Sequence, residues 1–354
     1  MIQATPFHAT PPAVRAYAFL HGRLGALKAQ LLRENDWARL SEARGFAEQK
    51  RLLLATSYSL WVAETLDGTL RSLGSALHHT ARTVEWSVPP EAADFIRAWA
   101  RRNLLRNLKT ILKGKALGRT EDEIRAELLD LDPGTSPQLP IASLVRAPSI
   151  ESVLDLLEGT ELQHWIHEAR RIYERDPTLF GLEAALDRLY YPELRDRIER
   201  LKPWDRVVES LVGDEIDQVN LMWLLRYRLN YGLSPAETYY LLVPVTGRVG
   251  ADELKRLVRQ ETIAGVAGQL PEHPFAALMG RCRTVWQVEV ELLRYRARNA
   301  RRLLREAAFT LGEGLALLVL REMEIRDLLA VLEGVRFGRS RAEIVEQLAL
   351  VPVG

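Results

Sequence analysis

The sequence lacks the features that mark secreted, disulfide-bonded or membrane-spanning proteins. Cys282 is the only cysteine among 354 residues, so no disulfide can form within the chain, as is usual in a reducing compartment. The longest apolar run, Leu315 to Leu320, is far shorter than the roughly 20 residues that cross a bilayer. The first residues also lack a signal-peptide pattern. We therefore expect a soluble or peripheral protein without a transmembrane segment.

An excess of charge of one sign is also missing. The chain has 48 lysines and arginines against 47 acidic residues, and its formal net charge is +1. It contains no recognised nucleic-acid-binding module. A nucleic acid is therefore not an expected partner.

Motifs that carry chemistry are absent as well. The sequence has no GxxxxGK[ST], no GxSxG, and no GxGxxG after a strand. His164 and His167 stand three residues apart, which does not fit the zincin spacing of four. The acidic clusters Asp214–Asp217 and Glu322–Glu324 lie within repeated segments, where salt bridges explain them without catalysis. We expect no catalytic residue, no metal and no cofactor.

Helical periodicity dominates what is present. Apolar residues recur three and four positions apart through most long segments, as in Leu104–Leu112 and Leu221–Leu229. Alternating runs are scarce, and Arg82 to Val88 is the most strand-like of them. Gly312 to Gly314 is predicted to interrupt a helix. The sequence therefore predicts an all-α fold.

One pattern occurs three times: an apolar helix end, a glycine, and then Ser/Thr-x-x-Glu. The first and third copies align without a gap, and the middle copy needs about one inserted residue. The residues that define the copies are Asn107, Gly118, Thr120 and Glu123; Asn220, Gly232, Ser234 and Glu237; and Asp327, Gly338, Ser340 and Glu343. Such repetition at long spacing indicates a three-unit helical array.

Each copy has the signals of a helix–turn–helix. The glycine can adopt the left-handed conformation that satisfies the last carbonyls of a helix. The Ser/Thr and the glutamate three residues later form a capping box that starts the next helix. Breaks in composition near Asp132–Pro140 and Val243–Gly247 follow the first two copies. They divide the chain into three predicted helical domains, 1–134, 135–249 and 250–354.

A locally basic helix is the main surface feature. It carries Arg294, Arg298, Arg301, Arg302 and Arg305 at helical spacing, with Arg296 between them. No acidic residue lies between Glu291 and Glu306. A charged run of this kind is commonly a solvated face, and it can also bind an acidic partner or anionic lipid. We predict that these arginines contribute to a partner contact.

Several segments resemble one protein family in both order and spacing. Arg321–Asp327, followed by Gly334 and Gly338, resembles the "KE.EIRN…I..G" signature of the C subunit of A/V-type rotary ATPases, which is the d subunit of the eukaryotic V-type enzymes. Asp217–Asn220 with Arg226–Arg228 is similar to that family's "D..N…LR.K" segment. The stretch from Tyr17 to Leu32 and the motif Thr56-Ser57-Tyr58 are similar to its "Y..AR.R…LL" and "T.Y".

The sequence departs from the family pattern at three places. Arg321 replaces the family's lysine, and Asp327 replaces its asparagine. Thr310-Leu311-Gly312 stands where Pro-Phe is common. The rest of the pattern runs through nearly the whole chain.

The resemblance implies a non-catalytic protein made of three similar helical domains in a funnel around a pseudo-threefold axis. Such a protein joins the central shaft of the soluble motor, formed by D- and F-type subunits, to the membrane proteolipid ring. It sits at the cytoplasmic face of the membrane and transmits rotation coupled to proton or sodium transport. Two alternatives from the residues alone are a free-standing helical adaptor and an all-helical enzyme. The enzyme would need a deep pocket with two or more acids of raised pKa.

Overall fold

The computed structural model describes residues 11–131, 139–175, 178–201, 205–270 and 272–351, and these residues form helices without any strand. The all-α prediction is therefore confirmed. The most strand-like run of the sequence, Arg82 to Val88, belongs mainly to helix α4. Leu77, Ala81 and Val84 are buried there at helical spacing, which explains the apolar pattern of this segment.

The helices follow one another along the chain with short connections. They are α1 (Pro11–Ala29), α2 (Glu34–Glu42), α3 (Phe46–Leu54), the 3₁₀ turn η1 (Ser59–Trp61), α4 (Leu66–Glu85), α5 (Pro90–Ala100), α6 (Arg102–Ala116), α7 (Glu121–Glu127), α8 (Ile141–Arg146), α9 (Ile150–Glu158), α10 (Gln163–Arg175), α11 (Leu179–Arg200), α12 (Arg206–Leu225), the π-helical turn η2 (Arg226–Asn230), α13 (Pro235–Leu241), α14 (Ala251–Leu257), α15 (Ile263–Gly268), α16 (Pro274–Met279), α17 (Val285–Glu306), α18 (Leu311–Arg336) and α19 (Arg341–Glu346).

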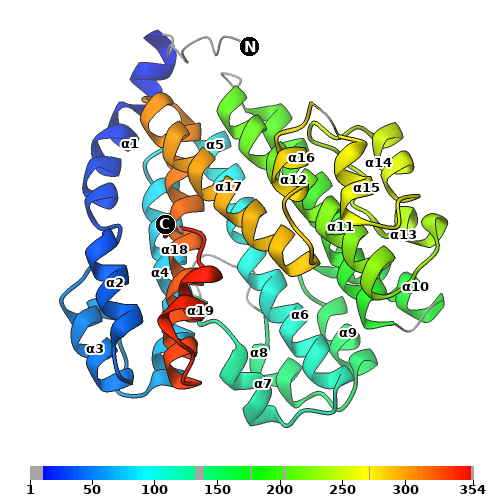
Figure 1. Cartoon of the computed structure of the whole chain (residues 1–354), viewed down its shortest axis with the longest axis horizontal. Coiled ribbons are helices and arrows are strands. Elements are labelled where there is room, and N and C mark those ends of the chain that lie inside the picture. Colours follow the sequence, from blue (N-terminus) through cyan, green and yellow to red (C-terminus); the bar gives the residue numbers. More distant parts are fainter. Residues whose placement is uncertain (1–10, 132–138, 176–177, 202–204, 271, 352–354) are drawn as a thin grey trace.

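Helix α18 organises the core. It packs against α1 to α4 from the start of the chain and against α12 and α17 (Figure 1). The residues from Leu315 to Val319 are all buried, as expected for a helix that is covered on every side. At its first turn Glu313 lies 2.7 Å from the Lys28 Nζ of α1. The two ends of the chain therefore share one core.

All three copies of the repeat fold into a long helix, a glycine turn and a short helix. They are α6–α7, α12–η2–α13 and α18–α19. Gly118, Gly232 and Gly338 have φ angles of 64°, 67° and 66°, which confirms the left-handed turns. The predicted capping boxes are also present, and they pair Thr120 with Glu123, Ser234 with Glu237 and Ser340 with Glu343. The local signals of the repeat are thus confirmed.

The asparagine of the first two repeats closes each unit. Asn107 Oδ1 accepts the N–H of Leu129 at 2.9 Å, and its Nδ2 donates to the Leu129 carbonyl at 2.8 Å. Asn220 makes the same exchange with Val243, at 2.8 and 3.3 Å. Both asparagines are buried. Each side chain therefore ties the long helix to the segment that follows the short helix.

Asp327 replaces asparagine in the third repeat and binds the equivalent segment differently. A carboxylate has no donor, and it accepts the N–H groups of both Ala349 and Leu350, at 2.9 and 2.8 Å. Burial raises the pKa of Asp327, and these backbone donors oppose that rise. We call these three side chains, Asn107, Asn220 and Asp327, the clasp residues.

The extra residue of the middle repeat is accommodated by η2. From the clasp residue to the glycine there are 11 steps in the first and third repeats and 12 in the second, because 118 − 107 = 11, 338 − 327 = 11 and 232 − 220 = 12. The π-helical turn Arg226–Asn230 lies within that interval. A π turn holds one residue more than the α turn that it replaces. The three glycine turns remain equivalent for this reason.

The division of the chain after residues 134 and 249 stays a prediction. The first of these boundaries, with the break at 132–138, lies outside the described residues.

Candidate functional site

One open cavity of about 550 Å³ lies between the long helices of the repeats. Its walls come mainly from α4, α6, α11, α12, α17 and α18. The charged residues that line it are Arg102, Arg106, Lys109, Lys113, Glu127, Glu183, Asp187, Glu215, Arg226, Glu289, Arg296, Glu322 and Arg326. Cations and anions are nearly balanced in this lining.

The same face of each repeat borders this space. The first repeat contributes Arg102, Leu105, Arg106, Lys109, Thr110 and Lys113. Aligning the clasp residues makes the six equivalent positions of the second repeat Glu215, Gln218, Val219, Met222, Trp223 and Arg226, which also line the cavity. The third repeat contributes Glu322, Ile325 and Arg326 to the cavity. Its next three positions, Leu329, Ala330 and Glu333, line a hollow of about 260 Å³ that shares Arg106 and Arg326 with the cavity.

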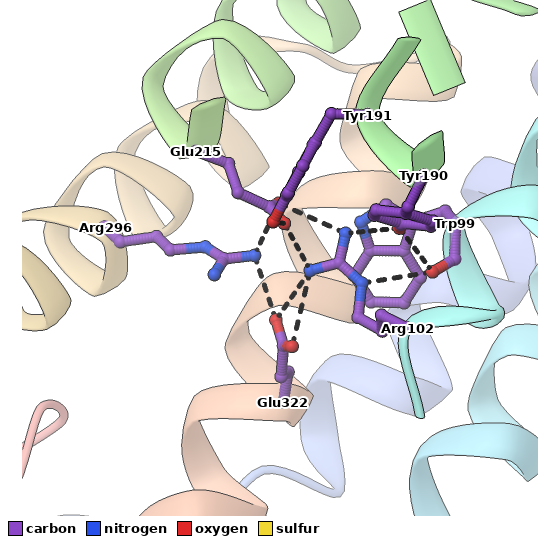
Figure 2. Close-up of polar contacts among 7 residues, drawn as sticks. All are labelled: Trp99, Arg102, Tyr190, Tyr191, Glu215, Arg296 and Glu322. Atoms are coloured by element: carbon purple, nitrogen blue, oxygen red, sulfur yellow. Dashed lines mark hydrogen bonds and ion pairs between the residues drawn. The ribbon is translucent and has the colours of Figure 1, made fainter. Parts of the chain in front are cut away.

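A group of ion pairs, here called the hub, lies at one end of these helix faces (Figure 2). Arg102 Nη1 lies 2.9 Å from Glu215 Oε1 and 3.3 Å from Glu322 Oε1. Arg296 Nη2 lies 2.9 Å from a carboxylate oxygen of each of the same two glutamates. Two cations and two anions thus neutralise one another where α6, α12, α17 and α18 meet.

Aromatic residues complete the surroundings of Arg102. Its Nε donates to the Trp99 carbonyl at 3.0 Å, and its guanidinium lies 4.0 Å from the centre of the Trp99 ring. Tyr190 also donates to the Trp99 carbonyl, and Tyr191 donates to Glu215 at 3.1 Å. Burial raises the pKa of both tyrosines. They therefore stay protonated at neutral pH and act as donors.

Three members of the hub are equivalent residues of the three repeats. Arg102, Glu215 and Glu322 each stand five residues before a clasp residue, since 107 − 102, 220 − 215 and 327 − 322 all equal 5. Arg102 contacts both of its counterparts. The three repeats therefore contact one another through residues at equivalent sequence positions.

Sequence reasoning predicted part of this site. It expected the acidic clusters to form salt bridges, which is confirmed for Glu215 and Glu322. It missed Arg102, and it placed Arg296 with the surface arginines although that side chain is only 13% exposed. The available signal was the repeat itself, because aligning the three copies on their clasp residues pairs Arg102 with both glutamates.

We expect Glu215→Gln to destabilise the protein more at pH 7 than at pH 3. Burial raises the pKa of Glu215, but the guanidinium groups of Arg102 and Arg296 outweigh burial and hold that pKa below its ordinary value. A carboxyl group whose pKa is lowered by folding stabilises the folded state at pH values above its pKa in the unfolded chain, which is about 4.3 for glutamate. This stabilisation is lost as the pH falls through the pKa of the folded state. Urea unfolding of both proteins from pH 3 to 7 measures the difference. A constant difference across this range would contradict the expectation.

The five arginines predicted to bind a partner all lie on α17 but have different surroundings. Arg294 donates to the carbonyls of Glu346 and Leu348, and Arg301 donates to that of Leu350. These two tie α17 to the C-terminal segment. Arg302 pairs with Glu306 at 2.8 Å on the surface. Arg298 and Arg305 are exposed, so they are the members of the group best placed for a partner.

The family-like motifs of the sequence meet in a second buried group. Tyr58, from the "T.Y" motif, donates to Glu324 at 2.7 Å, and Arg321 lies 2.7 Å from the same carboxylate. Burial raises the pKa of Glu324, while Arg321 and two hydrogen-bond donors oppose the rise. Arg321 is the cation of this group. The motif residues Arg321, Glu322, Glu324 and Asp327 therefore all have structural partners.

Acid–base chemistry has little support in the cavity. Burial raises the pKa of Glu183, whereas the pKa of Glu215 is lowered. Asp187 pairs with Lys109 at 2.5 Å, and Glu289 pairs with Arg226 at 2.8 Å. The lining acids mostly serve ion pairs, unlike the two raised carboxyls that the enzyme alternative requires.

The single cysteine also gives no support for a reactive site. Burial raises the pKa of the half-buried Cys282 thiol, which lowers its reactivity at neutral pH. Within the described ranges, no three His, Cys, Asp or Glu side chains are grouped to hold a metal ion. Among the helices of that same part of the chain, none combines the length and the apolar character needed to cross a membrane.

The fold and the site define an all-helical protein in which three related helix–glycine–helix units border one charged cavity. The sequence pattern of the ATP synthase (C/AC39) subunit family matches residues 20–347, and the chain belongs to that family. This membership confirms the resemblance drawn from the sequence. The chain is a subunit of an A/V-type ATP synthase, and a structural rather than a catalytic one.

Similar proteins cover most of the chain. It is 26% identical over 332 residues to the C subunit of the A-type ATP synthase of Methanocaldococcus jannaschii, and the match covers 90% of this chain and 82% of the relative. It is 25% identical over 345 residues to the protein of the same name from Methanothermobacter thermautotrophicus, covering 94% and 88%. The counterpart from Thermococcus kodakarensis is 23% identical over 283 residues, covering 78% and 73%.

Proposed function

We propose that this protein is the central-stalk connector of an A/V-type rotary ATPase. It links the central shaft of the soluble motor, made of D- and F-type subunits, to the membrane proteolipid ring. It transmits the rotation that couples ATP chemistry to proton or sodium transport. The main support for this proposal is the cavity bordered by the same face of all three repeats. A connector of this kind needs a cavity into which the end of the central shaft can insert.

The proposed architecture is a funnel of three similar helical domains around a pseudo-threefold axis. Contact among Arg102, Glu215 and Glu322 supports it, because equivalent points of related units touch only near the axis that relates them. The hub then forms the closed end of the funnel, and the cavity forms its interior.

Torque transmission requires a body that does not deform. The hub joins α6, α12, α17 and α18 by short ion pairs between largely buried side chains. The clasp residues fix the short helix of each repeat to its long helix. Paired and hydrogen-bonded charges of this kind have few alternative arrangements when buried. ATP and the transported ion are handled by other subunits.

The proposed location is the cytoplasmic face of the membrane, where the protein is held peripherally by the ring. A tagged chain purified from membranes of its own cells should bring the D- and F-type subunits and the proteolipid with it. Mass spectrometry of the eluate identifies them, with an untagged strain as the control. Recovery of the chain without shaft or ring subunits would overturn the proposal.

Reversing the charge of Arg298 and Arg305 should weaken this assembly about tenfold at low salt and less at high salt. Both side chains are exposed, and the strength of exposed ionic contacts falls with ionic strength. Arg301 is left unchanged because it binds the Leu350 carbonyl. Arg298→Glu/Arg305→Glu is compared with wild type in the pull-down at two salt concentrations.

The matched control reverses Arg39 and Arg51, which are exposed on α2 and α3. Equal recovery of partners with the α17 variant and with wild type would remove these arginines from the interface. The free-standing adaptor considered from the sequence has no comparable support, because the family match extends over residues 20–347.

A further inference from the structure

A large exposed hydrophobic residue immediately precedes the left-handed glycine in every repeat. Leu117, Tyr231 and Phe337 are 58%, 59% and 70% exposed. Single exposed hydrophobic residues are ordinary on protein surfaces. Their occurrence at the same position of all three units is not explained by chance scatter, and the capping of the helix requires only the glycine.

Backbone hydrogen bonds show that these residues continue the faces that line the cavity. The N–H groups of Leu117 and Phe337 donate to the carbonyls of Lys113 and Glu333, at 3.0 and 2.9 Å. Lys113 is the last residue of α6 that lines the cavity, and Glu333 lines the adjoining hollow from α18. A residue one turn further along a helix lies on the same face. Leu117 therefore extends the cavity-lining face of α6 by one turn, and Phe337 extends the face of α18 that lines the hollow.

Tyr231 is placed in the same way by the π-helical turn. Its N–H donates to the carbonyl of Arg226 at 3.0 Å across five residues rather than four. Arg226 is the last lining position of the middle repeat. The extra residue thus leaves Tyr231 on the cavity face, equivalent to Leu117 and Phe337.

The three side chains lie beyond the end of the lining faces that is farthest from the hub. The hub is at the opposite end of the lining faces, because its residues come first on each face and the three hydrophobic residues follow about four helical turns later. Phe337 also lines the hollow that shares Arg106 and Arg326 with the cavity. Each repeat therefore carries a charged residue at the hub end of its lining face and an apolar side chain at the other end.

We infer that Leu117, Tyr231 and Phe337 form an apolar collar that grips the helical end of the rotating shaft. This inference rests on the proposed function, which gives the cavity its occupant. A helix about 10 Å wide has a cross-section of about 80 Å², so a cavity of about 550 Å³ takes roughly one helical turn. The next turn of the shaft then lies at the mouth, where apolar contacts with the collar exclude water.

The test measures binding of the full-length chain to the purified shaft subcomplex of D- and F-type subunits from the same cells. The variant Leu117→Ser/Tyr231→Ser/Phe337→Ser should bind about 100-fold more weakly, since each truncated anchor costs roughly fivefold. Each single variant should lose about fivefold. Thermal unfolding should be nearly unchanged for Leu117→Ser and Phe337→Ser, because exposed substitutions usually have small effects on stability, whereas Tyr231→Ser also removes a ring contact with Phe180.

The matched control is Phe19→Ser/Leu60→Ser/Trp86→Ser, which removes three side chains of similar exposure, 63%, 82% and 66%, outside the repeats. It should bind the shaft like wild type. Equal affinity of the collar variant and wild type, or equal losses in both triple variants, would overturn the collar but not the proposed function. Weakened binding to the detergent-solubilised proteolipid ring, with shaft binding intact, would also overturn it. Failure of the wild-type chain to bind the shaft would overturn the proposed function itself.

Discussion

Replacing Arg102 by methionine is expected to lower the free energy of unfolding by about 3–5 kcal/mol, the usual cost of breaking a buried charge pair. Arg102 is 10% exposed and binds Glu215 and Glu322. Without it, two carboxylates share the single cation of Arg296, and the Trp99 carbonyl loses a donor. Chemical denaturation of the variant and wild type at pH 7 measures the loss.

The neighbouring residue provides the control. Arg101 pairs with Glu193 where both side chains are about a quarter exposed, so Arg101→Met should cost less than about 1 kcal/mol. Arg102→Met/Glu322→Gln should recover part of the loss, because Arg296 and Glu215 then remain as a balanced pair. A loss no larger for Arg102→Met than for Arg101→Met would mean that the hub does not stabilise the fold.

Replacing Asn107 by leucine should lower the free energy of unfolding by about 2–4 kcal/mol. The amide of Asn107 exchanges two hydrogen bonds with Leu129 and is only 1% exposed. Leucine would leave a buried N–H and a buried carbonyl without partners, and unpaired groups of this kind each cost about 1–3 kcal/mol. Thermal and urea unfolding measure the change.

The third repeat supplies a conservative comparison. Asp327→Asn converts that clasp to the residue found in the other two repeats, and it should cost about 1–3 kcal/mol because the buried N–H of Leu350 loses its acceptor. An asparagine can accept the N–H of Ala349 and donate to its carbonyl, as Asn107 does with Leu129. A free energy of unfolding of Asn107→Leu equal to that of wild type would mean that the clasp has no part in holding the repeats closed.

Short-range signals predicted the local structure of the repeats. The glycine turns, the capping boxes and Pro235 at the first position of α13 depend on residues within one helical turn. Even the identity of Gly114 and Gly334 between copies has a local cause. A Cβ atom there would lie 2.4 and 2.7 Å from Ile124 and Ile344 of the following short helix.

These short-range signals could not predict the contacts between helices that are distant in the sequence. The sequence does not show which arginines of α17 bind other parts of the chain, and Arg294, Arg296 and Arg301 all do so. The glycines around Glu313 were predicted to interrupt a helix, yet they lie in the first turn of α18. A Cβ at Gly312 would meet Val207 at 2.4 Å, a constraint that only the packed structure reveals.

The wide turn at Arg226–Asn230 has a consequence for exchanging parts between the units. One residue added to a regular helix would rotate everything beyond it by about 100°, and Tyr231 would then swing away from its two counterparts. The middle unit is thus one residue longer in sequence, but its residues beyond the turn keep the same orientation as their counterparts in the other two units. A graft of this unit into another position must carry all 12 steps between Asn220 and Gly232. Deleting one residue without converting the π turn to an α turn would rotate Tyr231 and the glycine turn away from their proper direction.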